Sequence, residues 1–201
     1  MTEPSWGVKI IFMLAAYAIG CIPCGLLISK AISGIDPRRE GSGNMGATNV
    51  LRVAGKTPAI ITLVCDILKG MFPVLLAQFF GLDQQSILFV GFSAILGHLF
   101  PVFLMFQGGK GVAVSLGVFL WVAPKIALIA VVIWLCGVAI GKYSSIGALA
   151  SFGALPFLAL MFNRTPEFIL FSFLVSSLVY FRHKENIIRL MSGEEKPSHP
   201  V

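Results

Sequence analysis

The chain has 201 residues, of which 57% are hydrophobic and only 12% are charged, and its mean hydropathy is +0.90. This composition excludes a water-soluble domain, because a chain of this length could not bury so much apolar surface. The net charge of +6 does not indicate a nucleic-acid-binding protein, since no arginine-rich arm or stacking motif accompanies the basic residues. We therefore expect an all-α integral membrane protein with the lipid bilayer as its partner and no nucleic acid.

Seven apolar segments are long enough to cross a bilayer, or nearly so if neighbouring helices shelter their ends. They are residues 8–32, 58–80, 86–103, 112–123, 126–140, 146–162 and 167–181. The fourth and fifth are short, and the turn at Pro124 and Lys125 between them could be a kink, so a five-span bundle is the alternative. We predict one transmembrane domain over residues 1–201, with a disordered polar tail at 192–201.

The lysines and arginines that flank the predicted spans fall unequally on the two sides of the membrane. If the N-terminus is outside, the inner set has eleven members: Lys30, Arg38, Arg39, Arg52, Lys56, Lys110, Lys142, Arg182, Lys184, Arg189 and Lys196. The outer set is Lys9, Lys125 and Arg164. Because positive loops favour the cytoplasm, we predict an outside N-terminus and a cytoplasmic C-terminus.

The first polar stretch, residues 41–52, lies between two predicted spans and is rich in small hydrogen-bond donors. Its polar and glycine residues are Gly41, Ser42, Gly43, Asn44, Gly46, Thr48, Asn49 and Arg52. Glycines let the backbone turn its N–H groups toward a ligand and approach it closely, and short polar side chains add donors. The stretch is predicted to hold a phosphate, and a flexible loop is the alternative.

A second glycine-rich stretch, residues 107–111, places Lys110 among Gly108, Gly109 and Gly111, directly before a predicted span. A cation and the unpaired N–H groups at a helix start favour an anion there. A P-loop is excluded because the required glycine and lysine spacing and a preceding strand are absent. A purely structural reversal between two helices is the alternative.

The segment that leaves the last span contains His183 and Asn186, which are three residues apart and would share one face of a helix. That face is predicted to hydrogen-bond a ligand. The alternative is a solvated helix at the membrane surface whose cations contact lipid headgroups, and we prefer this interpretation for Lys184 and Arg189.

Asp66 and Lys69 lie three residues apart inside the second predicted span, where isolated charges are costly. A proton path is one interpretation, and a salt bridge that fixes the helix is the one we prefer. His98 could be a general base, a phosphate contact or a helix-end cap, and we favour a structural role.

The predicted topology puts these three polar stretches and the turn at residues 141–145 on the cytoplasmic face. A transporter or channel for a small phosphorylated metabolite is the alternative function, but such proteins usually place polar residues near the midplane with access from both sides. The predicted outer loops contain almost nothing that would receive an anion. An enzyme with a one-sided phosphate site is therefore favoured.

Residues 41–52, the run from Gly97 to Ala113, and residues 182–187 resemble the three signature motifs of the bacterial acyl-phosphate:glycerol-3-phosphate acyltransferases, the PlsY family. The resemblance covers essentially the whole chain, including its length and its span pattern. It implies a multi-pass enzyme of the bacterial inner membrane with a cytoplasmic active site. Such an enzyme moves a fatty acyl group from acyl phosphate to the 1-hydroxyl of glycerol 3-phosphate, giving lysophosphatidic acid and phosphate.

The resemblance also implies roles for individual residues. Those at positions that hold glycerol 3-phosphate are Ser42, Arg52, Lys110, His183 and Asn186, and the first four are the expected catalytic residues. Those around the acyl phosphate head are Gly43, Asn44, Thr48, Gly108, Gly109 and Gly111. One departure from the family pattern is that Gly147 and Ala148 stand where a further serine is expected, which weakens a role for the turn at 143–145.

An acyl phosphate donor is reactive by itself, because it is a mixed anhydride with a good leaving group. The enzyme therefore needs mainly to align the acceptor hydroxyl and neutralise charge. We hypothesise that the donor's own phosphate oxygen accepts the hydroxyl proton. No cluster of histidine, cysteine and carboxylate at ligand spacing is evident, and we expect no metal, no cofactor and no obligatory protein partner.

Overall fold

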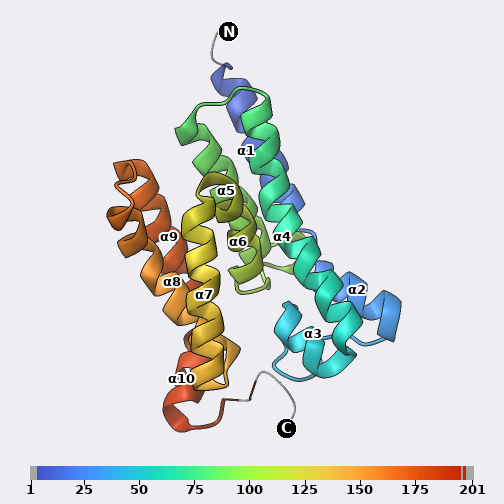
Figure 1. The fold of residues 1–201 in the computed structure, drawn as a ribbon. Coiled ribbons are helices and arrows are strands. Elements are labelled where there is room, and N and C mark those ends of the chain that lie inside the picture. Colours follow the sequence, from blue (N-terminus) through green and yellow to red (C-terminus); the bar gives the residue numbers. More distant parts are fainter. Residues whose placement is uncertain (1–3, 196, 198–201) are drawn as a thin grey trace. The chain divides into compact units, whose positions relative to one another are not determined.

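The computed structural model describes residues 4–195 and 197, and the regular structure in this part of the chain is helical (Figure 1). The prediction of an all-α protein is confirmed. The chain forms two compact units, Met1–Val122 and Ala123–Val201. The single transmembrane domain stays a prediction.

The first unit is built around the long helix α4. Its elements are α1 (Trp6–Gly20), α2 (Cys24–Ser33), α3 (Ala47–Ala54), α4 (Lys56–Phe79), α5 (Gln84–Leu99), the short 3₁₀ helix η1 (Val102–Leu104) and α6 (Val112–Val122). Helices α1, α5 and α6 each contact α4, and α1 also packs along α5. The short helices α2 and α3 lie against the first half of α4, so the polar stretch between them is held at that end of the unit (Figure 1).

The first predicted span is broken into α1 and α2 at Cys21, Ile22 and Pro23. Proline lacks a backbone N–H and disfavours a helical conformation in the residue before it, so the apolar run cannot continue as one helix. The break exposes the carbonyl group of Ile22, which accepts a hydrogen bond from the Lys69 ammonium at 2.7 Å. A charged residue of α4 thus stabilises the interruption.

Small residues let the helices of the first unit approach one another closely. At Gly20 of α1 an added Cβ atom would lie 2.2 Å from the Ala94 carbonyl oxygen, and at Gly97 of α5 it would lie 2.1 Å from that of Tyr17. Gly70 and Gly117 have the same role between α4 and α6. Such contacts are typical of helix pairs in membranes, where close packing replaces the hydrophobic effect as the source of association.

The second unit consists of α7 (Pro124–Gly141), α8 (Ser144–Met161), α9 (Pro166–Arg182) and the short α10 (Lys184–Ser192). Helix α8 packs on both α7 and α9. Two side chains of α9 bond to carbonyl groups of α8: the Ser176 hydroxyl to Phe152 at 2.6 Å and the Tyr180 hydroxyl to Leu149 at 2.9 Å. These bonds fix the end of α9 from which α10 departs.

Five helical segments among the described residues are long and apolar enough to cross a membrane: Trp6–Ser33, Lys56–Phe79, Gln84–Leu104, Pro124–Gly141 and Ser144–Met161. Each of the seven predicted spans contains a helix, but α6 and α9 are shorter than these five. Large apolar side chains stay exposed, for example Phe79 at 81% and Ile140 at 85%. Such exposure is unfavourable in water and suits contact with lipid.

Candidate active site

The polar stretch 41–52 forms a tight loop that leads into α3, and the buried Asn49 organises it. Gly41 and Gly43 have φ values of +64° and +71°, a conformation that other residues rarely adopt. The Asn49 side-chain amide donates to the carbonyl groups of Pro37, Glu40 and Asn44 at 2.9–3.1 Å. A Cβ atom at Gly41 would lie 2.2 Å from the Asn49 side-chain oxygen, so glycine is required there for space as well.

Several N–H groups expected to face a phosphate are bonded within the loop itself. The N–H of Ser42 donates to the Asn49 side-chain oxygen at 2.8 Å, and that of Gly43 donates to the Glu40 carbonyl at 3.0 Å. The N–H of Gly46 donates to the Asn44 side-chain oxygen at 2.8 Å. Asn49 is therefore a scaffold residue, which corrects our interpretation of it as a ligand donor. A phosphate at this loop would be bound mainly by side chains.

Two of the predicted site residues are carried on the short helix α3. Thr48 and Arg52 lie four residues apart on α3, so they share a face, and both are half-buried, as is Ser42 in the loop before them. The other cations nearby are engaged differently: Arg38 and Lys30 pair with Asp36 at 2.7 and 3.3 Å. The hydrogen bonds from Arg38 hold the pKa of Asp36 well below its ordinary value.

The second glycine-rich stretch is shaped by His98 at the end of α5. The N–H of Gly109 donates to the His98 carbonyl at 3.0 Å, and a Cβ atom at Gly109 would lie 2.2 Å from the imidazole. Gly111 has φ +87° and precedes the first residue of α6. Lys110, half-buried, thus stands between two constrained glycines at the start of a helix.

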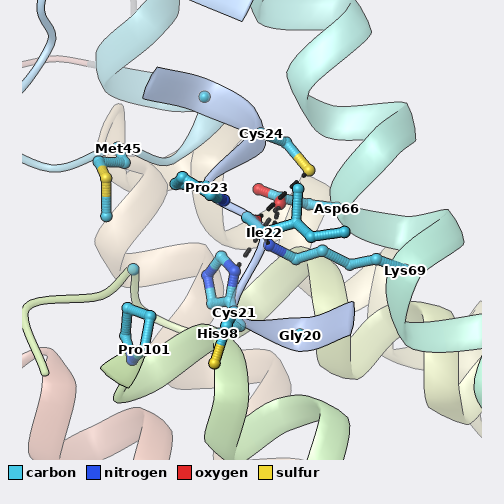
Figure 2. Close-up of a pocket in the computed structure, with 12 residues that line it drawn as sticks. Gly20, Cys21, Ile22, Pro23, Cys24, Met45, Asp66, Lys69, His98 and Pro101 are labelled. Atoms are coloured by element: carbon cyan, nitrogen blue, oxygen red, sulfur yellow. Dashed lines mark hydrogen bonds and ion pairs between the residues drawn. The ribbon is translucent and has the colours of Figure 1, made fainter. Parts of the chain in front are cut away.

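A pocket links the two glycine-rich stretches within the first unit, since Met45 of the first and Gly109 of the second both line it. At its wall the Lys69 ammonium lies 2.8 Å from the Asp66 carboxylate, and the His98 ring lies 3.7 Å from the same carboxylate (Figure 2). The expected ion pair is therefore present. The pair joins α4 to Ile22, in the break between α1 and α2, and to His98, which supports the loop around Lys110.

In the second unit, His183 is the residue between α9 and α10, and its side chain is buried. Its Nδ1 atom lies 2.8 Å from the Val179 carbonyl oxygen. Because a carbonyl can only accept, Nδ1 carries a proton and is occupied by this bond.

Asn186 is also buried, and its amide nitrogen donates to the Glu195 carboxylate at 2.6 Å. Glu195 also accepts from Ser145 at 3.0 Å and from Arg189 at 2.8 Å. Burial raises the pKa of Glu195, but these hydrogen bonds outweigh it and hold the pKa below its ordinary value. Arg189 is therefore paired within the protein, which differs from our expectation that it contacts lipid headgroups.

The contacts of Glu195 also differ from the expected disorder of residues 192–201. Ser192 ends α10, and residues 193–195 form a defined turn. The remaining part of the expected disordered tail, residues 196 and 198–201, lies outside the described residues. Sequence reasoning missed Glu195 and gave little weight to the turn that contains Ser145.

Comparison with known proteins decides the family. The family model described as "Glycerol-3-phosphate acyltransferase" matches residues 10–193. Curated glycerol-3-phosphate acyltransferases of Geotalea daltonii and Halorhodospira halophila are 43% and 44% identical, with 93% and 92% of this chain and 96% and 94% of theirs covered. The chain belongs to the glycerol-3-phosphate acyltransferase family.

Solved structures of this family share the fold. The crystal structure of PlsY (YgiH), an integral membrane glycerol 3-phosphate acyltransferase, in its glycerol 3-phosphate form has a TM-score of 0.90 at 36% identity, covering 95% of this chain and 96% of that one. The lysophosphatidic acid form has a TM-score of 0.88 at 35% identity. The resemblance drawn from the three motifs is confirmed.

The predicted site residues in the described part of the chain are cations and hydrogen-bonding side chains. No group of three or more histidine, cysteine or carboxylate side chains among the described residues could hold a metal ion. The first unit carries Ser42, Arg52 and Lys110, and the second carries His183 and Asn186. Glu195 lies beyond the stretch that the family model matches, so that match does not point to it.

Proposed function

We propose that this protein transfers a fatty acyl group from acyl phosphate to the 1-hydroxyl of glycerol 3-phosphate, giving lysophosphatidic acid and phosphate. The observation that carries the proposal is the similarity, at a TM-score of 0.90, to a PlsY structure in its glycerol 3-phosphate form. The glycine-rich loops with Arg52 and Lys110 support it, because each puts a cation beside a constrained backbone turn.

We assign the acceptor substrate to side chains that can bind an anion or a hydroxyl. Arg52 and Lys110 supply positive charge for the phosphate dianion, and the guanidinium can bind it bidentately. Ser42, His183 and Asn186 supply hydrogen bonds. Because Nδ1 of His183 donates to the Val179 carbonyl, its substrate contact is through Nε2.

We assign the acyl phosphate head to Gly43, Asn44 and Thr48 of the first loop and to Gly108, Gly109 and Gly111 of the second. Gly43 and Gly109 contribute shape, since their N–H groups are bonded to protein carbonyl groups. Side chains at these positions would fill the space beside the backbone. This assignment explains why both stretches need glycine without requiring every N–H to touch substrate.

The reaction needs alignment and charge neutralisation more than a covalent intermediate. The 1-hydroxyl oxygen of glycerol 3-phosphate attacks the acyl carbon, the bond from that carbon to the phosphate oxygen breaks, and phosphate leaves. The hydroxyl proton passes to an oxygen of the donor phosphate. Cationic side chains beside the departing phosphate lower the barrier because negative charge grows there.

For the membrane arrangement we propose seven crossings, with α6 and α9 as short spans. The N-terminus is outside, and the active site is on the cytoplasmic face of the bacterial inner membrane. The excess of lysine and arginine on that side supports the orientation.

The experiment that tests this function uses protein purified in detergent, palmitoyl phosphate and glycerol 3-phosphate, without added metal or nucleotide. We expect equal amounts of lysophosphatidic acid and free phosphate. Palmitoyl-CoA and palmitoyl acyl carrier protein are the competing donors to compare. Efficient turnover with palmitoyl-CoA and none with palmitoyl phosphate would overturn the assignment of the donor.

A further inference from the structure

The chain folds back on itself directly after α10. Gly193 has φ +74°, and the N–H groups of Glu194 and Glu195 both bond to the Arg189 carbonyl, at 2.8 and 3.2 Å. A left-handed glycine followed by such bonds is a common way to end a helix and reverse the chain. The turn carries the Glu195 side chain back to the helix that it has just left.

The Glu195 carboxylate has a hydrogen-bond donor at each of its oxygens. Oε1 accepts from the Asn186 amide at 2.6 Å and from the Ser145 hydroxyl at 3.0 Å, while Oε2 accepts from Nε of Arg189 at 2.8 Å. Glu195 is only 9% exposed, although it lies close to the end of the chain. A surface glutamate without a local role would remain in solvent.

These contacts fix the orientation of the Asn186 amide. An ionised carboxylate can only accept hydrogen bonds, so the nitrogen of the amide must face Glu195 and the oxygen must face the other way. That oxygen, Oδ1 of Asn186, is buried and has no hydrogen-bond partner among the described residues. A buried acceptor without a partner is costly, and at a functional site it indicates a group that a ligand satisfies.

We infer that Glu195 is a positioning residue, which orients Asn186 so that its Oδ1 accepts a hydrogen bond from a hydroxyl of glycerol 3-phosphate. This inference rests on the proposed function, in which Asn186 contacts the acceptor substrate. A phosphate dianion carries no proton to donate, so Oδ1 repels it. Asn186 therefore recognises the glycerol part of the substrate, and the cations recognise its phosphate.

The test exchanges the hydrogen-bond donor, Asn186, and the hydrogen-bond acceptor, Glu195. Glu195→Gln removes the carboxylate that dictates the amide orientation, and Asn186→Asp places a second carboxylate beside the first. In the double variant, the new amide at position 195 can donate to the new carboxylate at position 186, while the other oxygen of that carboxylate still faces the ligand. The matched control is Glu194→Gln, which removes the same charge from an adjacent exposed side chain.

For Glu195→Gln we expect the KM for glycerol 3-phosphate to rise about tenfold, as the loss of one well-formed hydrogen bond predicts. The KM for palmitoyl phosphate and kcat should stay within about twofold of wild type. Asn186→Asp should raise the KM for glycerol 3-phosphate further, and in the double variant this KM should return to within about threefold of wild type. A purely structural role for Glu195 would not produce this rescue or this selectivity between the two substrates.

Three results would overturn the inference: kinetics of Glu195→Gln that match those of Glu194→Gln, parallel changes in the KM of both substrates, or a double variant no better than Asn186→Asp. Calorimetric titration of each variant with glycerol 3-phosphate gives the same ranking without the donor. An inactive wild type that binds glycerol 3-phosphate with this ranking would therefore contradict the proposed function and leave the positioning role supported.

Discussion

Replacement of Asn49 by alanine should damage the loop before α3 without removing any side chain assigned to substrate. The two N–H groups of the amide, which are shared among three carbonyl groups, are lost together with the bond accepted from Ser42. At about 1 kcal/mol net for each of these three groups, the sum is about 3 kcal/mol. Only the bond to Pro37 is buried on both sides, and water can replace part of the others, so we expect about 2–3 kcal/mol.

The loss should appear both in stability and in catalysis. Thermal unfolding in detergent should occur at a lower temperature, and kcat/KM should fall about 100-fold, because a displacement of about 1 Å at a catalytic group has effects of that size. Asn49→Asp has the same shape, yet it points a carboxylate oxygen at three carbonyl groups and should be at least as harmful as alanine.

Ser42→Ala is the matched control, since it keeps the backbone N–H that bonds Asn49 and removes only the hydroxyl. It should unfold at the wild-type temperature while losing activity. An Asn49→Ala protein with wild-type stability, and with only the KM for acyl phosphate raised, would show that Asn49 binds the donor directly, and the scaffold argument would fail.

Three further outcomes are expected. Arg52→Ala should lower kcat/KM about 100-fold, whereas Arg39→Ala, which removes an exposed cation just before the stretch 41–52, should stay within about twofold in the same acyl transfer assay. Gly109→Ala should destabilise the protein by far more than the ordinary cost of about 1 kcal/mol, because the new methyl group would meet the imidazole of His98. Gly7→Ala, where a Cβ atom has no contact closer than 3.8 Å, should be neutral in thermal unfolding and activity. Because folding lowers the pKa of Glu195, the ionised carboxylate makes its full contribution to stability above the ordinary glutamate pKa of about 4.3. This contribution declines as the pH falls toward the lowered pKa. The difference in unfolding temperature between wild type and Glu195→Gln should therefore be constant from pH 8 to about pH 5 and shrink below about pH 4.

The length of apolar runs was sufficient to place most of the long helices. Predicted spans such as 126–140 and 146–162 agree with α7 and α8 to within two residues at each end, because polar turns interrupt the apolar sequence on both sides. The break at Pro23 was missed, although the proline itself was the signal. A count of apolar residues did not detect the break, because Pro23 stops the helix but hardly changes the composition of the segment.

The site was predictable in its residue types and less so in its geometry. Glycines and short polar side chains indicated a turn that holds an anion, and the turn is present with left-handed glycines at 41 and 43. The role of Asn49 could not be read from the sequence, because its amide reaches Pro37, twelve residues earlier, and that contact depends on the path of the whole loop. Chemically equal donors can serve substrate or scaffold, and only the three-dimensional structure separates them.

For Glu195, too, the sequence did not reveal the role, because that role depends on contacts with distant residues. A short, charged and polar segment at a chain end predicts disorder, since each such residue is well solvated and no apolar group anchors it. The left-handed Gly193 was a local signal for a turn, but Ser145 lies fifty residues away in sequence, and its hydroxyl had no visible connection to the tail. Once three donors converge on one carboxylate, the desolvation cost is offset by charge-assisted hydrogen bonds, and a residue expected in solvent becomes part of the arrangement that orients Asn186.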